Sequence, residues 1–600
     1  MAILASIQDL TKSFGSQELF KDVSFGISDG EQLGLIGPNG TGKSTLLKIL
    51  AGSIDPDEGE VVLKKGTRLV YLAQKDIFDD EQTIQTCLEK SLEDLHLSDT
   101  DIHVKIKQAI NQFGFPDSEQ KVKELSGGWK KRLAICRCLL KEPDILLMDE
   151  PTNHLDIAGI LWLESVIKNA RFSFLVISHD RYFLEHCTNR IIELNPRYPG
   201  GYLKIEGHYS DFIEKREAFI SEQAKKEVIL SNKVRRETEW LRRGPKARTT
   251  KAKYRIDDAY RLQGELQEVK QRNRSNQAAG FDFESNDKKS KILLRAHHIS
   301  KAYDEKSILN KFSLKLSPGM RIGLVGNNGS GKTTLMKMLS AELEPDEGNV
   351  KIAEGTRIVC FDQNRDQLNP DETLQDALSP SGSDSVIYRE KSVHIVTWAK
   401  RFLFKVEQLK SPVSTLSGGE QARILISRLM LKPADVLILD EPTNDLDIPS
   451  LDVLENSLSE FPGAIILATH DRYLLERVST HYLGFVGDGS VTAYADLDQC
   501  LKEQNQKTKK SKNKKEGKSQ GKKSSTSNKL SFKDQYELDH IEENILKAEK
   551  SAETFREQIQ DPKIIADTAK MTEACNNLEK AQGEVDHLYL RWGELEAKKN

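Results

Sequence analysis

A series of four motifs occurs twice in this chain of 600 residues, in the same order and at nearly the same spacing. The glycine-rich segment GPNGTGKST at residues 37–45 returns as GNNGSGKTT at 326–334, so that Lys43 and Lys332 are 289 positions apart. The segments LSGG, DEPTN-x-LD and HDRY each return 291 positions later. A single match could arise by chance, but an ordered series of four could not. The sequence therefore predicts two copies of one module, each of roughly 200 residues.

The glycine-rich segment of each copy predicts a loop that wraps around phosphate groups. In the first copy it lies between a buried apolar run at 33–36 and a helical segment at 44–50. Glycines let backbone N–H groups turn towards phosphate oxygens, and the helix N-terminus adds partial positive charge. Lys43 can then reach the outer phosphates and Ser44 can bind magnesium, with Lys332 and Thr333 as the second pair. The expected nucleotide-binding residues are Gly37, Pro38, Asn39, Gly40, Thr41, Gly42, Lys43, Ser44 and Thr45, and Gly326, Asn327, Asn328, Gly329, Ser330, Gly331, Lys332, Thr333 and Thr334.

Two continuous apolar runs, at 145–148 and 436–439, each end in Asp-Glu. Such runs are typical of strands covered on both faces of a parallel sheet. The aspartates Asp149 and Asp440 are expected to hold magnesium, largely through its water shell. The glutamates Glu150 and Glu441 are placed one residue further on, where they can orient or deprotonate the attacking water.

A histidine follows another buried apolar run in each copy. These histidines, His179 and His470, keep the 291-residue spacing. A single histidine would more often be structural, but two at one offset after Asp-Glu favour contact with the terminal phosphate and the attacking water. The two copies are thus expected to bind ATP with Mg²⁺ and to hydrolyse it to ADP and phosphate.

The four motifs, in this order, resemble those of the ATP-binding cassette family. The resemblance implies nucleotide-binding Q-loop glutamines at Gln74 and Gln363, and aromatic side chains near the adenine at Phe14 and Tyr303. It also implies that two cassettes close head to tail, with each ATP between the glycine-rich loop of one and the LSGG of the other. One ATP would then contact Lys43 and the residues Ser417, Gly418 and Gly419, and the other Lys332 and the residues Ser126, Gly127 and Gly128.

Two cassettes in one chain, without an apolar run long enough to span a bilayer, resemble the ABC-F class, within it most closely the bacterial Uup type. The features that carry the likeness are LSGGW at 125–129, DEPTNDLD in the second cassette, a basic linker and a C-terminal coiled coil. Trp129 departs from the Gln or Glu that is usual in this family, whereas the second copy has Glu420. Equal turnover at the two sites therefore does not follow from the resemblance.

The segment between the copies is strongly basic, although the whole chain has a net charge of −4. Seven Lys or Arg and no acidic residue occur in WLRRGPKARTTKAKYRI at 240–256. Helix-forming stretches flank its Gly-Pro, and Ala259, Leu262, Leu266 and Val269 have the spacing of a helix–helix seam. The sequence predicts a helical hairpin with a basic tip. A solvated tip is one interpretation; contact with RNA is the other, and the candidate residues are Arg242, Arg243, Lys246 and Arg248.

The C-terminal segment predicts a second hairpin. A lysine-rich, apolar-poor tract at 502–529 is expected to be disordered. Beyond it, apolar residues step by three and four from Leu538 to Ile559 and from Met571 to Leu595, on either side of Asp561-Pro562. Two such arms around a proline predict an antiparallel coiled coil. Uup-type proteins carry a similar region associated with DNA binding, so the resemblance implies DNA as a second partner.

The predicted fold class is α/β: two P-loop ABC ATPase domains, a helical hairpin linker and a C-terminal antiparallel coiled coil. The expected boundaries are 1–206 and 291–500 for the ATPase domains, 207–290 for the linker, 501–530 for the disordered tract and 531–600 for the coiled coil. Seven cysteines without paired spacing, and an N-terminus without a secretory pattern, favour the cytoplasm.

ABC-F resemblance implies that the protein binds the ribosome and directs its linker towards tRNA. The function expected on this basis is an ATPase that acts on tRNA-bearing or stalled translation complexes through ATP-driven closure of its cassettes. A DNA-binding ATPase in genome maintenance is the alternative. A motor subunit for a separate transporter is disfavoured, because both cassettes and a basic linker share one chain, and no transmembrane partner is expected. Pairing of the cassettes within a monomer is also expected.

Overall fold

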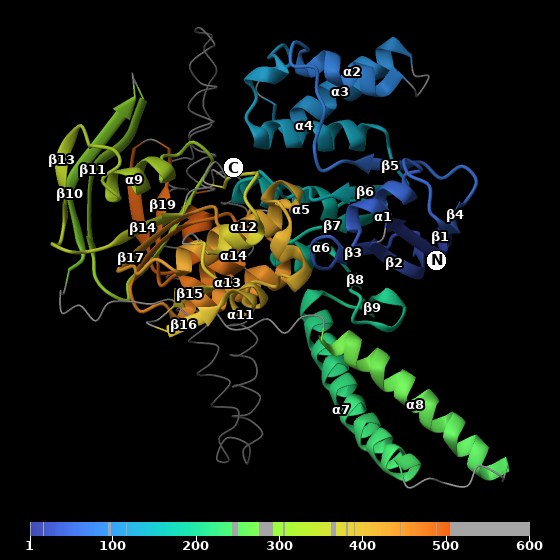
Figure 1. The fold of residues 1–600 in the computed structure, drawn as a ribbon. Helices are drawn as coiled ribbons and strands as arrows, with labels where there is room; N and C mark the ends of the chain where they lie inside the picture. The colour runs from blue at the N-terminus through green and yellow to red at the C-terminus, as the bar shows by residue number, and fades with distance from the viewer. Residues whose placement is uncertain are drawn as a thin grey trace, which may run out of the picture. The chain divides into compact units, whose positions relative to one another are not determined.

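The computed structural model describes residues 2–15, 17–93, 98–115, 117–242, 250–274, 292–303, 306–361, 368–379, 382–388, 391–444, 446–487 and 489–504. All of them belong to one compact unit, Met1–Lys512. They form two α/β cassettes, separated in sequence by two long helices (Figure 1). The predicted fold class is confirmed for these parts. The predicted coiled coil at 531–600 lies outside the described residues, as does the lysine-rich tract from residue 505 onward.

Each cassette contains a six-stranded sheet with the same order of strands. In the first cassette the order is β5-β6-β7-β3-β8-β9, and in the second it is β14-β17-β18-β12-β19-β20. All neighbouring strands are parallel except the last pair of each sheet. The strands are β3 (Gln32–Ile36), β5 (Leu69–Leu72), β6 (Ile145–Asp149), β7 (Ser173–Ile177), β8 (Arg190–Leu194), β9 (Tyr202–Glu206), β12 (Arg321–Gly326), β14 (Ile358–Phe361), β17 (Val436–Asp440), β18 (Ala464–Ala468), β19 (His481–Phe485) and β20 (Val491–Tyr494).

The predicted buried strands lie at the centre of these sheets. Every residue of β6, β7 and β18 is buried, because helices or a second sheet cover both faces. A three-stranded antiparallel sheet forms the second layer of each cassette, in the orders β2-β1-β4 and β11-β10-β13. These strands are β1 (Ile3–Phe14), β2 (Gln17–Ser28), β4 (Glu58–Leu63), β10 (Leu294–Tyr303), β11 (Lys306–Leu316) and β13 (Glu347–Ile352).

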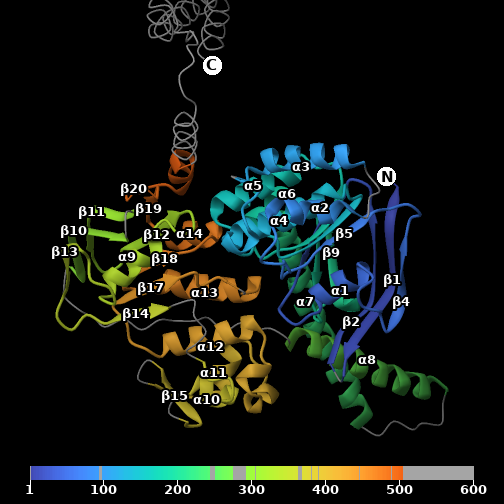
Figure 2. The same ribbon diagram turned by 90° about the horizontal axis from the view of Figure 1, so that it is seen from above.

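Most helices of the two cassettes also correspond. The helix after each glycine-rich loop packs inside its cassette, as Figure 2 shows for α9 beside β12 and β18. The helices of the first cassette are α1 (Lys43–Leu50), α2 (Ile84–Leu92), α3 (Asp99–Phe113), α4 (Gly127–Leu140), α5 (Ile157–Lys168) and α6 (Arg181–Cys187). Those of the second are α9 (Lys332–Leu339), α10 (Leu374–Leu378), α11 (Ile395–Arg401), α12 (Gly418–Met430), α13 (Ile448–Glu460) and α14 (Arg472–Val478).

The cassettes differ in the segment before the LSGG motif. The first cassette has α2 and α3 there, whereas the second has α10, the hairpin of β15 (Ser385–Tyr388) and β16 (Lys391–His394), and α11. Buried aromatic residues, among them Trp398 and Phe402, fill the second version. Short 3₁₀ turns complete the described elements: η2 (Val122–Glu124), η3 (Pro199–Gly201), η5 (Val406–Lys410) and η6 (Val413–Thr415).

The predicted helical hairpin is present as α7 (Tyr209–Arg242) and α8 (Thr250–Arg274). Its seam is the predicted one, since Leu266 and Val269 form a buried cluster with Leu230. Arg242 is exposed at the end of α7, whereas Arg243, Lys246 and Arg248 lie outside the described residues.

Candidate functional site: two nucleotide sites between the cassettes

The glycine-rich loops have the backbone shape that phosphate binding requires. Gly42 and Gly331, the residues before α1 and α9, have φ values of 87° and 107°. A Cβ atom at Gly42 would lie 2.9 Å from the Phe20 ring, and one at Gly331 would lie 2.5 Å from Ile308 Cγ2. Glycine is therefore required at both positions by conformation and by space. The loops present backbone N–H groups and a helix N-terminus to the site.

The lysines of the two loops are held in equivalent positions. Lys43 Nζ donates to the carbonyl oxygens of Gly37 and Pro38, at 2.7 and 3.1 Å. Lys332 Nζ donates to those of Gly326 and Asn327, at 2.6 and 3.2 Å. Burial lowers the pKa of both ammonium groups, against the opposing effect of nearby carboxylates. A buried cation with carbonyl partners gains from a polyanion, so both lysines suit phosphate binding.

A hydroxyl and a carboxylate meet at each magnesium position that the sequence predicts. Ser44 Oγ donates to Asp149 Oδ1 at 3.1 Å, and Thr333 Oγ1 donates to Asp440 Oδ2 at 2.8 Å. Burial raises the pKa of the Asp149 carboxyl, which indicates that this group lacks sufficient compensating charge. Oxygen donors of these two kinds fit Mg²⁺. The two pairs are the residues of the described chain that could hold it.

The glutamates after these aspartates have an unusual backbone. Glu150 and Glu441 have φ values of 49° and 47°, a left-handed conformation that non-glycine residues seldom adopt. Their N–H groups donate to Ile177 and Ala468, on the neighbouring strand of each sheet. Burial, reinforced by the adjacent aspartate, raises the pKa of the Glu150 carboxyl, and burial raises that of Glu441 to about 8. Carboxylates of this kind suit the acceptance of a proton near neutral pH.

The predicted switch histidines lie beside these glutamates. His179 Nε2 is 3.7 Å from Glu150 Oε1, and His470 Nε2 is 3.3 Å from Glu441 Oε1. Burial lowers the pKa of each imidazole to about 3, and the nearby loop lysine adds to the effect. Both rings are therefore neutral at physiological pH. A neutral imidazole can donate through one nitrogen and accept through the other.

Residues of both cassettes line two cavities. One, of about 650 Å³, is lined by the first glycine-rich loop, by Glu150 and by Ser417, Gly418 and Gly419. The other, of about 440 Å³, is lined by Asn328, Gly329, Glu441 and His470 together with Gly127, Gly128 and His179 of the first cassette. The head-to-tail arrangement that the family resemblance implies is thus the arrangement of this chain. We call the first cavity site 1 and the second site 2.

Of the other residues that the resemblance implies, two line site 1. Gln74 lines site 1 and donates to Glu150 Oε2 at 2.8 Å, and Phe14 also lines site 1. Tyr303 is half exposed and is not among the described residues that line site 2. Gln363 lies outside the described residues.

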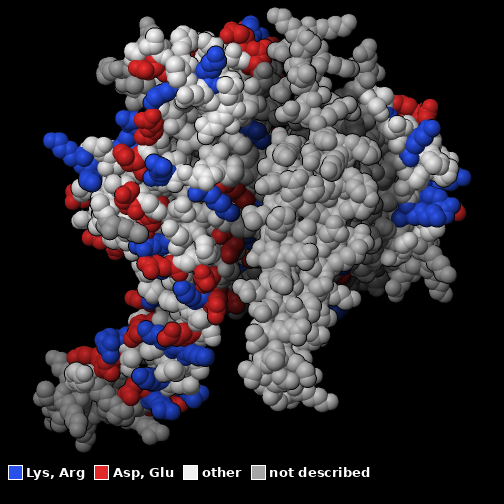
Figure 3. Space-filling view, turned by 180° about the vertical axis from the view of Figure 1, so that it is seen from behind, with Lys and Arg blue, Asp and Glu red and all other residues white. Residues whose placement is uncertain are grey.

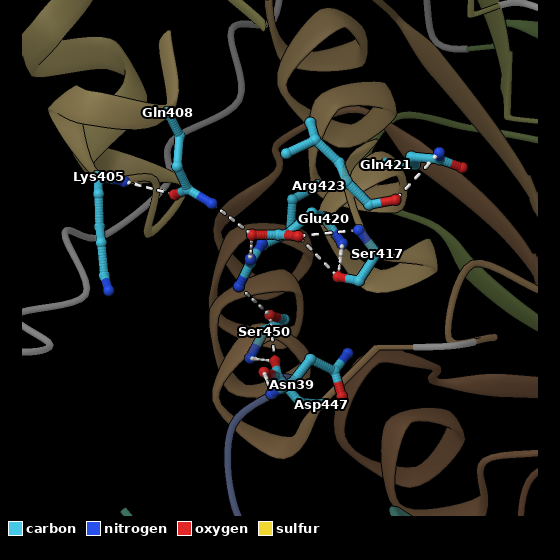
Figure 4. Close-up of polar contacts among 10 residues, drawn as sticks. Asn39, Lys405, Gln408, Ser417, Glu420, Gln421, Arg423, Asp447 and Ser450 are labelled. Atoms are coloured by element: carbon cyan, nitrogen blue, oxygen red, sulfur yellow. Dashed lines mark hydrogen bonds and ion pairs between the residues drawn. The ribbon is translucent and has the colours of Figure 1, made fainter. Parts of the chain in front are cut away.

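The two LSGG segments differ, and Figure 4 shows the second. Ser417 caps α12: its Oγ accepts from the Glu420 N–H, and its own N–H donates to Glu420 Oε2 at 2.9 Å, which completes a capping box. The Ser417 hydroxyl also donates to Glu420 Oε2, at 2.8 Å. Gln408 and Arg423 contact the other oxygen of this carboxylate, at 2.8 and 3.8 Å. In the first segment Ser126 makes no side-chain cap bond to α4, and Trp129 has no carboxylate that could complete a capping box.

Trp129 belongs instead to an aromatic cluster. Its ring packs against Phe115, and the Arg132 guanidinium lies between it and Trp162, 4.9 and 4.8 Å from the two ring centroids. The two sites therefore differ: Glu420 contributes a polar helix cap at site 1, whereas Trp129 contributes aromatic packing at site 2.

Two aspartates connect the cassettes, although the sequence alone does not indicate a role for them. The Asn39 N–H donates to Asp447 Oδ2 at 2.8 Å, and the Asn328 N–H donates to Asp156 Oδ2 at 3.4 Å. The next residue in each case, Ile448 or Ile157, is buried in a hydrophobic cluster made mostly of the other cassette. Both aspartates end a repeated DEPTN-x-LD segment, so the repeat itself marks them. Their position in the sequence does not indicate a contact across the cassettes.

Two α/β cassettes, with a glycine-rich loop of one facing the LSGG of the other, define a tandem ABC ATPase. The family model described as "ABC transporter" matches residues 20–153 and 309–444, and that of the "ABC transporter C-terminal domain" matches 529–597. The chain belongs to the ABC-F family, with Uup-type proteins among its most similar relatives. It binds ATP and is an ATPase.

The similarity to curated relatives extends along the whole chain. ATP-binding protein Uup of Caulobacter vibrioides is 33% identical over 612 residues, which cover 100% of this chain and 98% of that protein. Energy-dependent translational throttle protein EttA of Haemophilus influenzae is 32% identical, over 82% of this chain and 93% of that protein. The solved structure titled RNase-L Inhibitor shares the fold, with a TM-score of 0.55 and 22% identity over 81% of this chain and 90% of that one.

Within the described part of the chain, no helix combines the length and the apolar character needed to cross a membrane.

Proposed function

We propose that both sites hydrolyse ATP with Mg²⁺, and that Glu150 and Glu441 accept the proton of the attacking water. The support is that each cassette brings together a glycine-rich loop, a hydroxyl–aspartate pair and a buried glutamate whose pKa is raised. Magnesium would be held by Ser44 with Asp149 and by Thr333 with Asp440, and it would offset phosphate charge. Lys43 and Lys332 would bind the outer phosphates, and the neutral histidines His179 and His470 would orient the water.

ATP would also hold the two cassettes together. The triphosphate would contact a positive loop on one cassette and the N-terminus of α4 or α12 on the other, so its binding favours closure. Hydrolysis and release of phosphate remove these contacts. The cycle therefore converts the chemistry of ATP into opening and closing.

We further propose that the protein uses this cycle in the cytoplasm on ribosomes that carry tRNA or have stalled. The proposal rests on the hairpin of α7 and α8, which the binding and hydrolysis of ATP do not require. Its helices carry charges of both signs (Figure 3, lower left), whereas residues 240–256, which include the segment between α7 and α8 in sequence, contain seven basic and no acidic residues. Such a concentration of Arg and Lys suits phosphates and exposed bases. A relative is named a translational throttle protein, which supports the same function.

The test uses the variant Glu150→Gln/Glu441→Gln, in which closure should persist after ATP binding. We expect it to co-sediment with ribosomes in the presence of ATP and to inhibit growth when expressed. Replacing Arg242, Arg243, Lys246 and Arg248 by Glu should abolish both effects and leave ATP binding intact. Single alanine changes should be mild, because each exposed phosphate contact contributes little and competes with salt. If a folded fourfold variant keeps both effects, the RNA assignment of the tip is wrong.

DNA is the second candidate partner, on the strength of one observation. Residues 502–529 contain eleven lysines and two acidic residues, and polyanion affinity rises with the number of phosphates neutralised. Ribonuclease and deoxyribonuclease treatment of the sedimented complex separates the two functions. Release by deoxyribonuclease alone would favour DNA.

A further inference from the structure

The HDRY segments do more than supply the switch histidines, because each arginine crosses to the other cassette. Arg181, the first residue of α6, pairs with Glu455 of α13 at 2.7 Å and lies 3.4 Å from Asp452. Arg472, the first residue of α14, pairs with Glu164 of α5 and lies 3.9 Å from Asp180, the residue after His179. Both arginines and both glutamates are buried. An uncompensated buried charge is costly, so these pairs hold the four side chains firmly.

The tyrosines of the same segments complete a reciprocal arrangement. The Arg181 guanidinium lies over the ring of Tyr473, 4.5 Å from its centroid, and that of Arg472 lies over Tyr182, at 5.0 Å. The two tyrosine rings are 6.2 Å apart. Each arginine therefore meets both a carboxylate and an aromatic face of the other cassette. These are the interactions for which arginine is better suited than lysine.

Each of these ion pairs lies close to a switch histidine. Arg181 and Arg472 are two residues beyond His179 and His470. Neither ring nitrogen of His179 has a hydrogen-bond partner among the described residues, so the backbone of its loop must place the ring. The His470 ring has one partner besides its loop, since its Nε2 lies 2.9 Å from Asn328 Oδ1. The near end of this loop is held within its own cassette, where the Asp180 N–H donates to Ser178 Oγ at 3.1 Å. Its far end is held within the cassette by the bond from the Phe183 N–H to Asp180 Oδ1, at 2.9 Å, and across the interface by Arg181.

One helix of the opposite cassette connects the two walls of each site. In α13, the N-terminal cap Asp447 accepts the bond from the glycine-rich loop of site 1, and Glu455, two turns further on, binds Arg181. In α5, Asp156 and Glu164 make the corresponding contacts with the loop of site 2 and with Arg472. The glycine-rich loop and the switch histidine of each site are therefore both fastened to one helix of the other cassette.

From this geometry we propose that Arg181 and Arg472 are positioning residues that place His179 and His470 for hydrolysis only while a glutamate of the other cassette holds them. When the cassettes separate, the glutamate leaves with its helix and the histidine loop loses its anchor. The ion pair thus makes catalysis at each site depend on pairing, in addition to the contribution of the opposite LSGG.

The experiment measures ATP turnover in two single-site backgrounds of the full chain. Glu441→Gln leaves site 1 active, and Glu150→Gln leaves site 2 active. In the first background, Arg181→Met should lower kcat at least tenfold, with a change in KM below threefold, and Arg472→Met should have a smaller effect. In the second background the order of the two variants should reverse. A purely structural role at a shared interface would give the same order in both backgrounds, and that result would overturn the proposal.

The chain offers a matched control. Arg477 also contacts Glu455, at 3.2 Å, but it lies in the same cassette and outside the histidine loop. Arg477→Met should keep kcat at site 1 within twofold; a loss as large as that of Arg181→Met would contradict the proposal. Adding Glu455→Leu to Arg181→Met should reduce kcat no further, because the arginine acts through that glutamate. If Arg181→Met does not fold in a thermal unfolding assay, Arg181→Lys and Glu455→Gln provide the same comparison between backgrounds.

Discussion

The backbone N–H of Asn39 donates a 2.8 Å hydrogen bond to Oδ2 of Asp447, a residue 408 positions further along the chain and in the other cassette. Burial raises the pKa of the Asp447 carboxyl, but Arg423 and the hydrogen-bond donors Ser450 and Asn39 outweigh burial and lower the pKa overall. Asp447 is therefore a carboxylate at neutral pH. Its charge lies against the loop whose other N–H groups we propose to bind phosphate.

Replacing Asp447 by Ser separates this contact from the capping of α13. Serine is a good helix cap, but its side chain is too short to reach Asn39. We expect the thermal midpoint to change little and turnover at site 1, measured in the Glu441→Gln background, to fall about tenfold, as the loss of one charge-assisted hydrogen bond predicts. Asp156→Ser is the matched variant at site 2. Its effect should be smaller, because the Asn328 bond is longer, at 3.4 Å; equal effects would contradict this reasoning.

The double variant Glu150→Gln/Glu441→Gln should bind ATP and lose most turnover. The amide keeps the size and hydrogen bonding of the side chain but cannot accept a proton, and loss of a general base costs on the order of 10²–10⁴ in rate. Phosphate release and equilibrium binding of a fluorescent ATP analogue measure the two properties separately. Turnover within twofold of the unmodified protein would exclude these glutamates as the base.

Glu420→Ala should change the ATP dependence of site 1 and leave site 2 unaffected. The Glu420 carboxylate occupies the N-terminus of α12, where it competes with any phosphate for the helix dipole and for the Ser417 hydroxyl. Its removal should lower KM at site 1 severalfold and cost about 1 kcal/mol of stability through loss of the cap. Gln408→Ala is the control, because Gln408 contacts the same carboxylate on the side away from Ser417. An unchanged KM would show that the phosphates do not approach Glu420.

The elements around each site could be predicted from sequence because their signals are local. Asp149 and Asp440 end continuous apolar runs, and those runs are the buried central strands. The partners of Asp447 and Arg181 could not be predicted in this way. Both residues lie in repeated segments, but each bonds to the opposite cassette, and the identity of a distant partner depends on packing that no local pattern records. The exchange of a capping box for an aromatic cluster at Trp129 likewise depends on Phe115 and Trp162, which are remote in sequence.

The end of the second cassette gives a further prediction. Residues 497–504 are helical, Cys500 is fully buried, and Gln504 Nε2 donates to Val325 O on the strand before the glycine-rich loop. This helix extends past residue 500, the boundary that the sequence favoured, because its apolar face packs on the cassette core. Truncation after Gln499 should therefore lower the free energy of unfolding by roughly 1–3 kcal/mol. Truncation after Gln504 should leave stability and ATP turnover unchanged.

The same pair of truncations tests the lysine-rich tract. Both remove at least ten of its eleven lysines, so both should weaken binding to free DNA and flatten its dependence on salt. Fluorescence anisotropy across a salt series measures this. Unchanged affinity would show that the tract is not a nucleic-acid-binding element.

The bonds from Asn39 to Asp447 and from Asn328 to Asp156 have a further consequence, because they join distant parts of a single polypeptide. Covalent linkage keeps the two cassettes together at any protein concentration, so their pairing is an intramolecular event. Specific activity should therefore not fall when the protein is diluted, as it would for cassettes that meet by collision. A single proteolytic cut between α7 and α8 would leave every catalytic side chain in place, yet it would turn an intramolecular equilibrium into a bimolecular one.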